Sequence, residues 1–177
     1  MSALVVYESM FGNTQAIARD IADGLSSHMS VETVEVGDAP KVVDAGVELL
    51  VVGGPTHALG MSRARTRRDA AQQAGHAVVS TGIGIREWLA TVQGGSKNIA
   101  AAAFDTRINK PRVPGSAARA AQKRLGRLGF RTVVPAESFW VTGTPGPLLD
   151  GEPERARRWG ERLGSIFSTT ERTRRVS

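Results

Sequence analysis

Near the start of the chain, four residues of one short loop have the side chains and spacing to hold a phosphate. Ser9, Asn13 and Thr14 offer hydroxyl and amide groups, and Gly12 is free to take unusual backbone angles. The loop contains no Lys or Arg, so hydroxyls and backbone N–H groups would have to bind the anion. Unpaired N–H groups and the helix dipole favour an anion where a helix begins. The sequence therefore predicts an anion site here if a helix follows the loop.

The residues around this loop predict a strand before it and a helix after it. An apolar run covers 4–7, and Ile17, Ile21 and Leu25 then recur at a spacing of four residues. Strand, tight loop and amphipathic helix would place the free N–H groups of the helix beside the loop. The local pattern thus supplies the geometry that the anion site needs.

Two further strands are predicted to end in loops of the same kind. The apolar runs 47–52 and 99–104 are typical of strands buried on both faces of a parallel sheet. In such sheets, ligands bind beyond the carboxyl ends of the strands. We therefore expect the loops 8–14, 53–60 and 105–109 to lie at one edge of the sheet.

The remaining pattern predicts a single α/β domain at 1–168. It gives a half-exposed strand at 31–36, helices at 62–73 and 85–92, a helix capped by Ser116 that stops at Gly129, a last strand at 132–134 and 138–141 interrupted near Pro135, and a final helix from Pro153. Strands that alternate with helices argue for one parallel sheet covered on both faces. The stretch 169–177 lacks apolar periodicity and is predicted to be a disordered tail.

Composition narrows the classes of protein. The 177 residues are 41% hydrophobic and 23% charged, which is ordinary for a soluble globular domain. No apolar run approaches the roughly 20 residues that span a membrane, and the N-terminus has no basic leader, so we expect a cytoplasmic location. The absence of Cys excludes disulfides and thiolate sites, and His28, His57 and His76 show no spacing typical of zinc sites.

The charge is unevenly distributed along the chain. Residues 1–60 hold 2 basic and 8 acidic residues, a net charge of −6, whereas 61–177 hold 21 basic and 9 acidic residues, a net charge of +12. A basic surface could attract an acidic redox partner, an anionic substrate or nucleic acid. Because no aromatic residues interleave with the charges, nucleic acid is disfavoured and a solvated helix face is the simpler interpretation.

The first loop and its helix resemble the signature of the flavodoxin family, in which this loop binds the phosphate of FMN. The residues that carry the resemblance are Tyr7, Ser9, Gly12, Thr14, Ala18 and Ile21. The stretch 54–57 resembles the family's second flavin loop, which wraps the isoalloxazine ring, and 105–107 has the place of the third. The resemblance covers about 3–168. It implies an α/β, doubly wound three-layer sandwich with a five-stranded parallel sheet of order 2-1-3-4-5.

The resemblance also assigns the cofactor, FMN, and the residues that would bind it. The phosphate would contact the side chains of Ser9, Asn13 and Thr14 and the N–H groups of Met10, Phe11 and Gly12. One side of the ring would be bordered by Pro55, Thr56, His57 and Ala58. Its other face and its pyrimidine edge would be bordered by Asp105, Thr106 and Arg107, largely through backbone groups. No residue is predicted to be catalytic, and no metal is expected.

The ring site departs from the family pattern. Flavodoxins usually stack aromatic residues on the ring, whereas the second loop here has His57 and the third has no aromatic residue after Phe104. Stacking on the ring should therefore be weaker. A positive charge from Arg107, and from His57 if it is protonated, would stabilise an anionic flavin by around 1 kcal/mol or more. We therefore predict a less negative reduction potential than that of an acidic flavodoxin.

Three functions are compatible with these features. The first is an FMN-binding electron carrier that passes electrons between a reductase and an acceptor, with an acidic partner such as ferredoxin or a reductase. The second is a flavin-dependent NAD(P)H:quinone or porphyrinogen-type oxidoreductase, in which the segment 75–96 and the cluster Arg63 to Arg68 form a rim for a small quinone-like substrate. The third is a non-redox binding module with a basic surface. The resemblance favours the carrier over a stand-alone enzyme.

Overall fold

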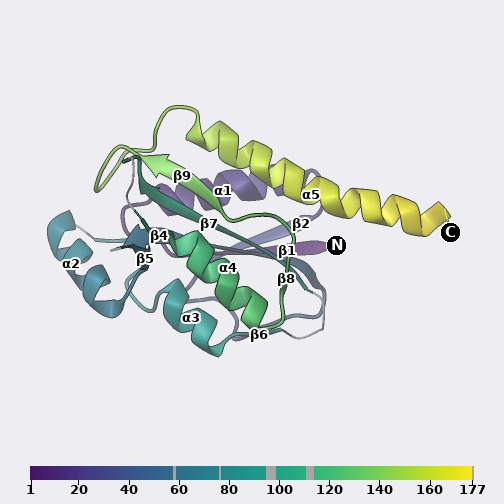
Figure 1. The fold of residues 1–177 in the computed structure, drawn as a ribbon, viewed down its shortest axis with the longest axis horizontal. Coiled ribbons are helices and arrows are strands. Elements are labelled where there is room, and N and C mark those ends of the chain that lie inside the picture. Colours follow the sequence, from purple (N-terminus) through teal and green to yellow (C-terminus); the bar gives the residue numbers. More distant parts are fainter. Residues whose placement is uncertain (58, 76, 95–98, 111–113, 177) are drawn as a thin grey trace.

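A parallel sheet runs through the middle of the molecule (Figure 1). The computed structural model describes residues 1–57, 59–75, 77–94, 99–110 and 114–176, and side chains as far as residue 167. The strands of this sheet are β1 (Ser2–Tyr7), β2 (Ser30–Glu35), β4 (Val47–His57), β7 (Ala100–Ile108), β8 (Arg131–Thr132) and β9 (Glu137–Val141). Their order is β2-β1-β4-β7, followed by β8 and β9, which both pair with β7.

The fifth position of the sheet is shared by two short strands. β8 pairs with 100–101 of β7 and β9 pairs with 104–108, both in parallel. They are therefore two parts of one interrupted strand, as the sequence predicts around Pro135. With β4 as the third strand and β7 as the fourth, the predicted order 2-1-3-4-5 and the α/β sandwich are confirmed.

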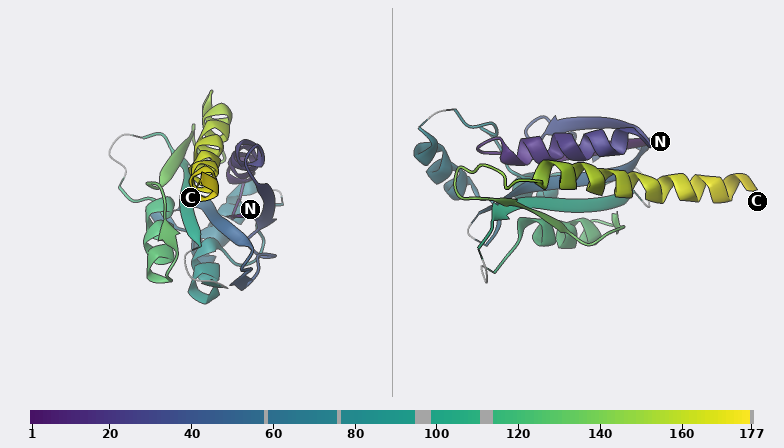
Figure 2. Two further views of the ribbon diagram at one scale, coloured as in Figure 1. Left: turned by 90° about the vertical axis from the view of Figure 1, so that its right-hand side faces the viewer. Right: turned by 90° about the horizontal axis from the view of Figure 1, so that it is seen from above.

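Helices cover both faces of the sheet (Figure 2). One face carries α1 (Asn13–Ser26) and α5 (Glu152–Val176), which pack against each other, and the other carries α3 (Ile85–Thr91) and α4 (Ala117–Arg127). α2 (Ala64–Ala74) lies beyond the carboxyl ends of the strands (Figure 1). It follows β5 (Gly60–Met61), which pairs antiparallel with the end of β4. α2 is therefore placed to border a site at that edge.

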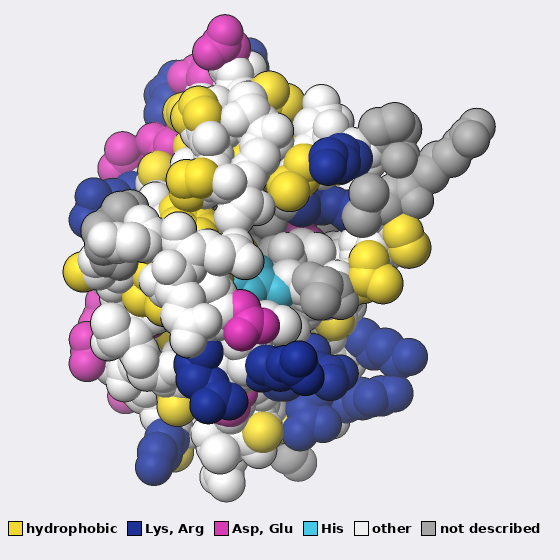
Figure 3. Space-filling view, turned by 90° about the vertical axis from the view of Figure 1, so that its left-hand side faces the viewer, with side chains coloured by type: hydrophobic (Ala, Val, Ile, Leu, Met, Phe, Trp, Pro, Cys, Tyr) yellow, Lys and Arg dark blue, Asp and Glu magenta, His cyan; other side chains and the backbone are white. Residues whose placement is uncertain are grey.

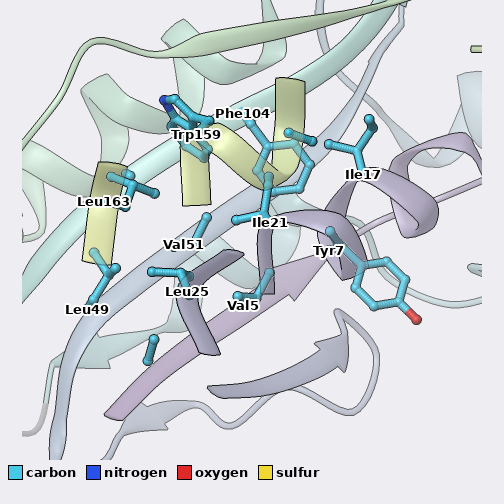
Figure 4. Packing of buried hydrophobic residues seen from close by; sticks show 14 of the residues in the cluster. Val5, Tyr7, Ile17, Ile21, Leu25, Leu49, Val51, Phe104, Trp159 and Leu163 are labelled. Carbon is cyan, nitrogen blue, oxygen red and sulfur yellow. The ribbon is translucent and has the colours of Figure 1, made fainter. Parts of the chain in front are cut away.

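Two apolar layers hold the helices on the sheet. Between the sheet and the α1–α5 pair, Phe104, Phe139 and Trp159 meet edge to face with ring centroids 6.2–6.4 Å apart. Figure 4 shows Phe104 and Trp159 among the aliphatic side chains of this layer. On the other face, Trp88 is 1% exposed, so it is a core residue as predicted. Phe104 is fully buried, so its ring packs in the core.

Two of the predicted loops are largely strand, which corrects the sequence-based boundaries. β4 continues to His57 and β7 to Ile108, and the two stay paired through Gly54 with Asp105 and Pro55 with Thr106. The prediction ended both strands early because glycine, proline and polar residues interrupt the apolar pattern there. The residues of these segments are therefore held by sheet hydrogen bonds.

The ends of other elements also differ from the expectation. A second, two-stranded sheet pairs β3 (Val42–Val43) with β6 (Gln93–Gly94), which the sequence did not predict. The backbone of α5 stays helical to Val176, across most of the stretch 169–177 that was predicted as a tail. Within the described residues, no helix combines the length and hydropathy needed to cross a bilayer.

Candidate functional site

The loop between β1 and α1 presents a group of unpaired backbone donors. Gly12 is the N-cap of α1 with a φ of +90°, in the left-handed region that favours glycine. Its N–H donates to the Ser9 hydroxyl at 3.1 Å. Within the described residues, the N–H groups of Phe11, Asn13 and Thr14 have no acceptor. Free N–H groups where a helix begins favour an anion, so this loop is a candidate anion site.

The loop is fixed in place by the segment that precedes α3. Ser9 and Ser80 are joined by two hydrogen bonds, because Ser9 N–H donates to the Ser80 hydroxyl at 2.9 Å and Ser80 N–H donates to the Ser9 carbonyl at 2.8 Å. Val79 N–H donates to the Met10 carbonyl at 3.1 Å, and the Ser80 hydroxyl donates to Glu35 at 2.5 Å. These bonds hold the free donors in a fixed arrangement before any ligand arrives.

A pocket of about 370 Å³ lies over this loop. Ten of the predicted site residues line it: Ser9, Met10, Phe11, Asn13, Thr14, Pro55, Thr56, His57, Thr106 and Arg107. Two others, Gly12 and Asp105, do not line it, and Ala58 lies outside the described residues. The structure therefore brings residues from three distant stretches of the chain to one cavity, at the carboxyl edge of the sheet.

One face of α2 and the residues after β9 also line the pocket, and the prediction of site residues missed them. They are Thr66, Asp69, Ala70, Gln73, Ile108, Val141, Gly143, Thr144 and Pro145. The four residues from α2 follow the i, i+3, i+4, i+7 spacing of a helix face. In the sequence, this face of small and polar residues differs from the arginine-rich remainder of the helix. That difference was the signal that could have predicted a pocket-lining face. Pro145 also accepts a hydrogen bond from the Asn13 amide at 2.6 Å.

The carboxylate of Asp105 is turned away from the pocket. Its Oδ2 accepts hydrogen bonds from the hydroxyls of Ser116 (2.6 Å) and Thr56 (2.9 Å) and from Ala118 N–H (3.0 Å). Ser116 is the N-cap of α4, as predicted, and its hydroxyl accepts from Arg119 N–H. Asp105 therefore ties the start of α4 to the sheet, and it could face a ligand only through its backbone. Its Oδ1 is buried with no partner among the described residues.

Glu8 is a buried carboxylate directly behind the phosphate loop. It accepts hydrogen bonds from the Ser62 hydroxyl and from Ile85 N–H at 2.8 Å. Arg67 of α2 donates to Ser62 at 2.8 Å and forms an ion pair with Glu87 at 3.1 Å. Burial raises the pKa of Glu8 from its ordinary value, and the bonds to Ser62 and Ile85 oppose that shift. This network fastens α2 and α3 to the end of β1, and so sets the wall of the pocket.

The charge of His57 differs from the protonated state that the sequence analysis considered. Burial lowers the pKa of His57 from 6.5, and the positive charge of Arg67 lowers it further, so the imidazole is neutral at pH 7. Positive charge on the pocket wall therefore comes from Arg107, whose guanidinium carbon lies 5.6 Å from the centroid of the Trp140 ring. Asp69 of α2 places a carboxylate on the same pocket and offsets part of that charge.

The comparisons with known proteins give one family. The flavodoxin family model matches residues 5–159. None of the curated protein sequences matches this chain.

Among solved structures, a flavodoxin from the domain Archaea is 19% identical with a TM-score of 0.62, over 94% of this chain and 98% of that one. Oxidised flavodoxin 1 from Bacillus cereus is 16% identical with a TM-score of 0.64, over 90% and 95%. A WrbA-like flavodoxin protein from Agrobacterium tumefaciens is 16% identical with a TM-score of 0.54, over 93% and 96%. At these identities the likeness shows a common fold.

Proposed function

This chain belongs to the flavodoxin family, whose cofactor is FMN, and on that premise we propose that its pocket holds FMN and that it carries electrons between a reductase and an acceptor. The observation that carries the proposal is the set of free N–H groups at Phe11, Asn13 and Thr14, three residues that line the pocket together with the stretches that resemble the family's flavin loops. When bound, FMN supplies the one- and two-electron chemistry, and the protein supplies binding and tuning.

The phosphate loop fits a dianionic group. The loop offers three backbone donors and the hydroxyls of Ser9 and Thr14 to the pocket. It contains no Lys or Arg. Each hydrogen bond to a charged group contributes about 1.5–3 kcal/mol, so several uncharged donors together can hold a phosphate. The Thr14 and Thr106 hydroxyls are also hydrogen-bonded to each other at 2.7 Å, which holds the two side chains together.

The opposite part of the pocket fits a flat ring better than it fits a second anion. Backbone from 55–57 and 106–107 runs along it in paired strands, and the small side chains Thr66 and Ala70 of α2 close it. Among the described lining residues, Phe11 is the one Phe, Tyr or Trp, and it lies in the phosphate loop. The ring would therefore be held by backbone and by small side chains, with weaker stacking than in flavodoxins with paired aromatics.

An electron carrier needs the flavin positioned but needs no side chain that delivers a proton to a substrate. The imidazole of His57 makes no hydrogen bond with any described residue, so it is not held in a pair typical of general acid–base catalysis. This supports the carrier over the quinone reductase. A cytoplasmic location remains a proposal from the sequence.

The test starts with the colour and ligand of the purified protein. We expect a flavin absorption band and quenching of FMN fluorescence on titration into the apoprotein, with riboflavin bound more weakly because it lacks the phosphate. Steady-state assays with NADPH and menadione should then show no turnover without a reductase. Unquenched FMN fluorescence would refute the cofactor, and rapid unaided turnover would favour the oxidoreductase.

A further inference from the structure

Four guanidinium groups lie around the start of α2 and have no carboxylate partner among the described residues. Arg63, Arg65 and Arg68 are exposed, and none of them forms an ion pair within the described part of the chain. Arg86 donates to the backbone carbonyls of Met61 and Ser62, just before α2, at 2.8 and 3.0 Å. Its positive charge therefore also lies at the start of this helix. We call these four residues the arginine rim.

The rim borders the proposed flavin pocket. Arg65 and Arg68 flank Thr66 and Asp69 on α2, and both of those line the pocket. Figure 3, which looks onto this end of the molecule, shows Lys and Arg side chains gathered beside a hollow in which a histidine is visible. A molecule that docked on the rim would therefore cover or adjoin the pocket opening.

The stability of α2 does not explain the rim. Positive charges at the start of a helix are disfavoured by its dipole, and no acidic residue lies in the first turn of α2. Arg65 and Arg68 are also like charges three residues apart on one face. Of the arginines at 63–68, only Arg67, which turns inward to Glu87, has an evident structural role, and Arg86 has one through its bonds to the carbonyls of Met61 and Ser62. Charges that oppose their own helix are expected where they serve recognition.

Two exposed aliphatic side chains lie close to rim residues along the chain. Leu59 is 55% exposed in the turn before β5, and Ile83 is 43% exposed just before α3. Arginine is enriched at protein interfaces, and these two side chains add exposed apolar area. Within the described residues, no Trp, Tyr or Phe is strongly exposed, so the surface lacks the stacking platforms of single-stranded nucleic-acid sites.

We propose that the arginine rim is the docking surface for an acidic electron-transfer protein, which places its redox centre at the flavin pocket. This inference rests on the proposed carrier function and adds the partner's chemistry and its place of contact. The net charge of +6 for the whole chain, together with the exposed arginines at this edge, would speed the encounter with an acidic partner and repel a basic one. In the transfer step, one electron leaves the partner's reduced centre, which is oxidised by one electron, and reduces the bound flavin by one electron.

The first test measures binding without any redox reaction. The probe is the oxidised form of an acidic [2Fe–2S] ferredoxin, titrated into the protein by calorimetry at low ionic strength. The triple variant R63E/R65E/R68E should weaken binding by at least about tenfold, and added salt should weaken wild-type binding steeply. The matched control R19E/R158E/R162E carries the same charge change on exposed residues of α1 and α5 and should alter binding less than about threefold.

The second test measures electron transfer by stopped flow. The second-order rate constant for flavin reduction by reduced ferredoxin should fall at least about tenfold in the rim variant. Transfer from the reduced protein to the basic cytochrome c should rise instead. Equal effects of the rim variant and the control would overturn the docking site.

A third experiment distinguishes this proposal from nucleic-acid binding and from failure of the carrier function. Tighter binding of a labelled DNA duplex than of ferredoxin, lost in the rim variant alone, would assign the rim to nucleic acid and overturn the proposal. Failure of the carrier function would be seen differently, as absent FMN binding in both variants and wild type. The calorimetric binding of ferredoxin would still report on the rim in that case, because it needs no flavin.

Discussion

The two sides of the pocket are built in different ways. On the phosphate side, one contiguous stretch, 9–14, supplies the donors, and a short strand–loop–helix unit sets their direction. On the ring side, side chains from β4, β7 and α2 meet, and two of them, Asp69 and Arg107, carry opposite charges. The first side depends on local geometry, whereas the second depends on how distant elements are fastened together. Substitutions should therefore have local effects on one side and wider effects on the other.

The largest effect is expected at Glu8, which fastens the ring side. Glu8→Ala leaves Ile85 N–H buried without its acceptor and removes one carboxylate from the surroundings of Arg67. We expect a loss of about 3 kcal/mol in the free energy of unfolding, measured by urea denaturation of the apoprotein. The substitution should also loosen α2 and weaken binding of FMN and riboflavin alike.

The isosteric variant Glu8→Gln is the control for this prediction. Its amide oxygen can still accept one of the two hydrogen bonds, so a loss of about 1 kcal/mol is expected. If Glu8→Ala and Glu8→Gln had equally small effects, the network behind the loop would not be what fastens α2.

The next effect is expected on the phosphate side, where ligand contacts can be separated from packing. Thr14→Val keeps the shape of the side chain but removes its hydroxyl. FMN binding should weaken about tenfold, which corresponds to about 1.4 kcal/mol, while riboflavin binding should change little. Fluorescence titration with both flavins measures the ratio.

A matched substitution on the ring side completes this test. Thr66 lies on the pocket-facing stripe of α2, so Thr66→Val should change the affinities for FMN and riboflavin by the same factor. Two variants with the same FMN-to-riboflavin ratio would mean that the division of the pocket into two sides is wrong.

The same division explains what the sequence could predict. The phosphate loop was predictable because Ser9, Gly12 and Thr14 lie within six residues of one another, between a clear strand and a clear helix. The sheet order and the carboxyl edge as the site were also predictable, because the buried strands have plain apolar runs.

The ring side was only partly predictable, because tertiary contacts decide it. The orientation of Asp105 depends on the N-terminus of α4, and the place of α2 depends on Arg67 reaching the network of Glu8. The neutral state of His57 likewise follows from its burial and from Arg67, which lies ten residues further along the chain. None of these contacts leaves a pattern in the neighbouring sequence from which it could be predicted.

A smaller effect is expected on the reduction potential of bound flavin. Arg107→Ala removes a positive charge from the pocket wall, which should disfavour an anionic reduced flavin by about 1 kcal/mol, or shift the potential by about 40 mV to more negative values. Asp69→Asn should shift it in the opposite direction, and Arg107→Lys, which keeps the charge, should shift it less than Arg107→Ala. Spectroelectrochemical titration measures all three. A very negative potential in the wild type would contradict the expected influence of Arg107.

The smallest effect concerns the protonation of His57. Because the folded protein lowers the pKa of His57 below its unfolded value of 6.5, the unfolded state binds more protons between these two values. The contribution of His57 to stability is therefore complete above pH 6.5 and is lost as the pH falls through the folded pKa. Urea denaturation of the wild type and of His57→Asn across this range should show a difference in unfolding free energy that shrinks toward acid.

The comparison of the wild type with His57→Asn separates the pH-dependent contribution of His57 to stability from that of Glu8. The raised pKa of Glu8 acts with the opposite sign, because its contribution is present below 4.5 and is lost as the pH rises through its folded pKa. Both proteins keep Glu8, so its contribution cancels in their difference. A difference that grew toward acid would mean that His57 gains a proton on folding. The ring side would then carry more positive charge than Arg107 alone supplies, and the potential would depend on pH through His57.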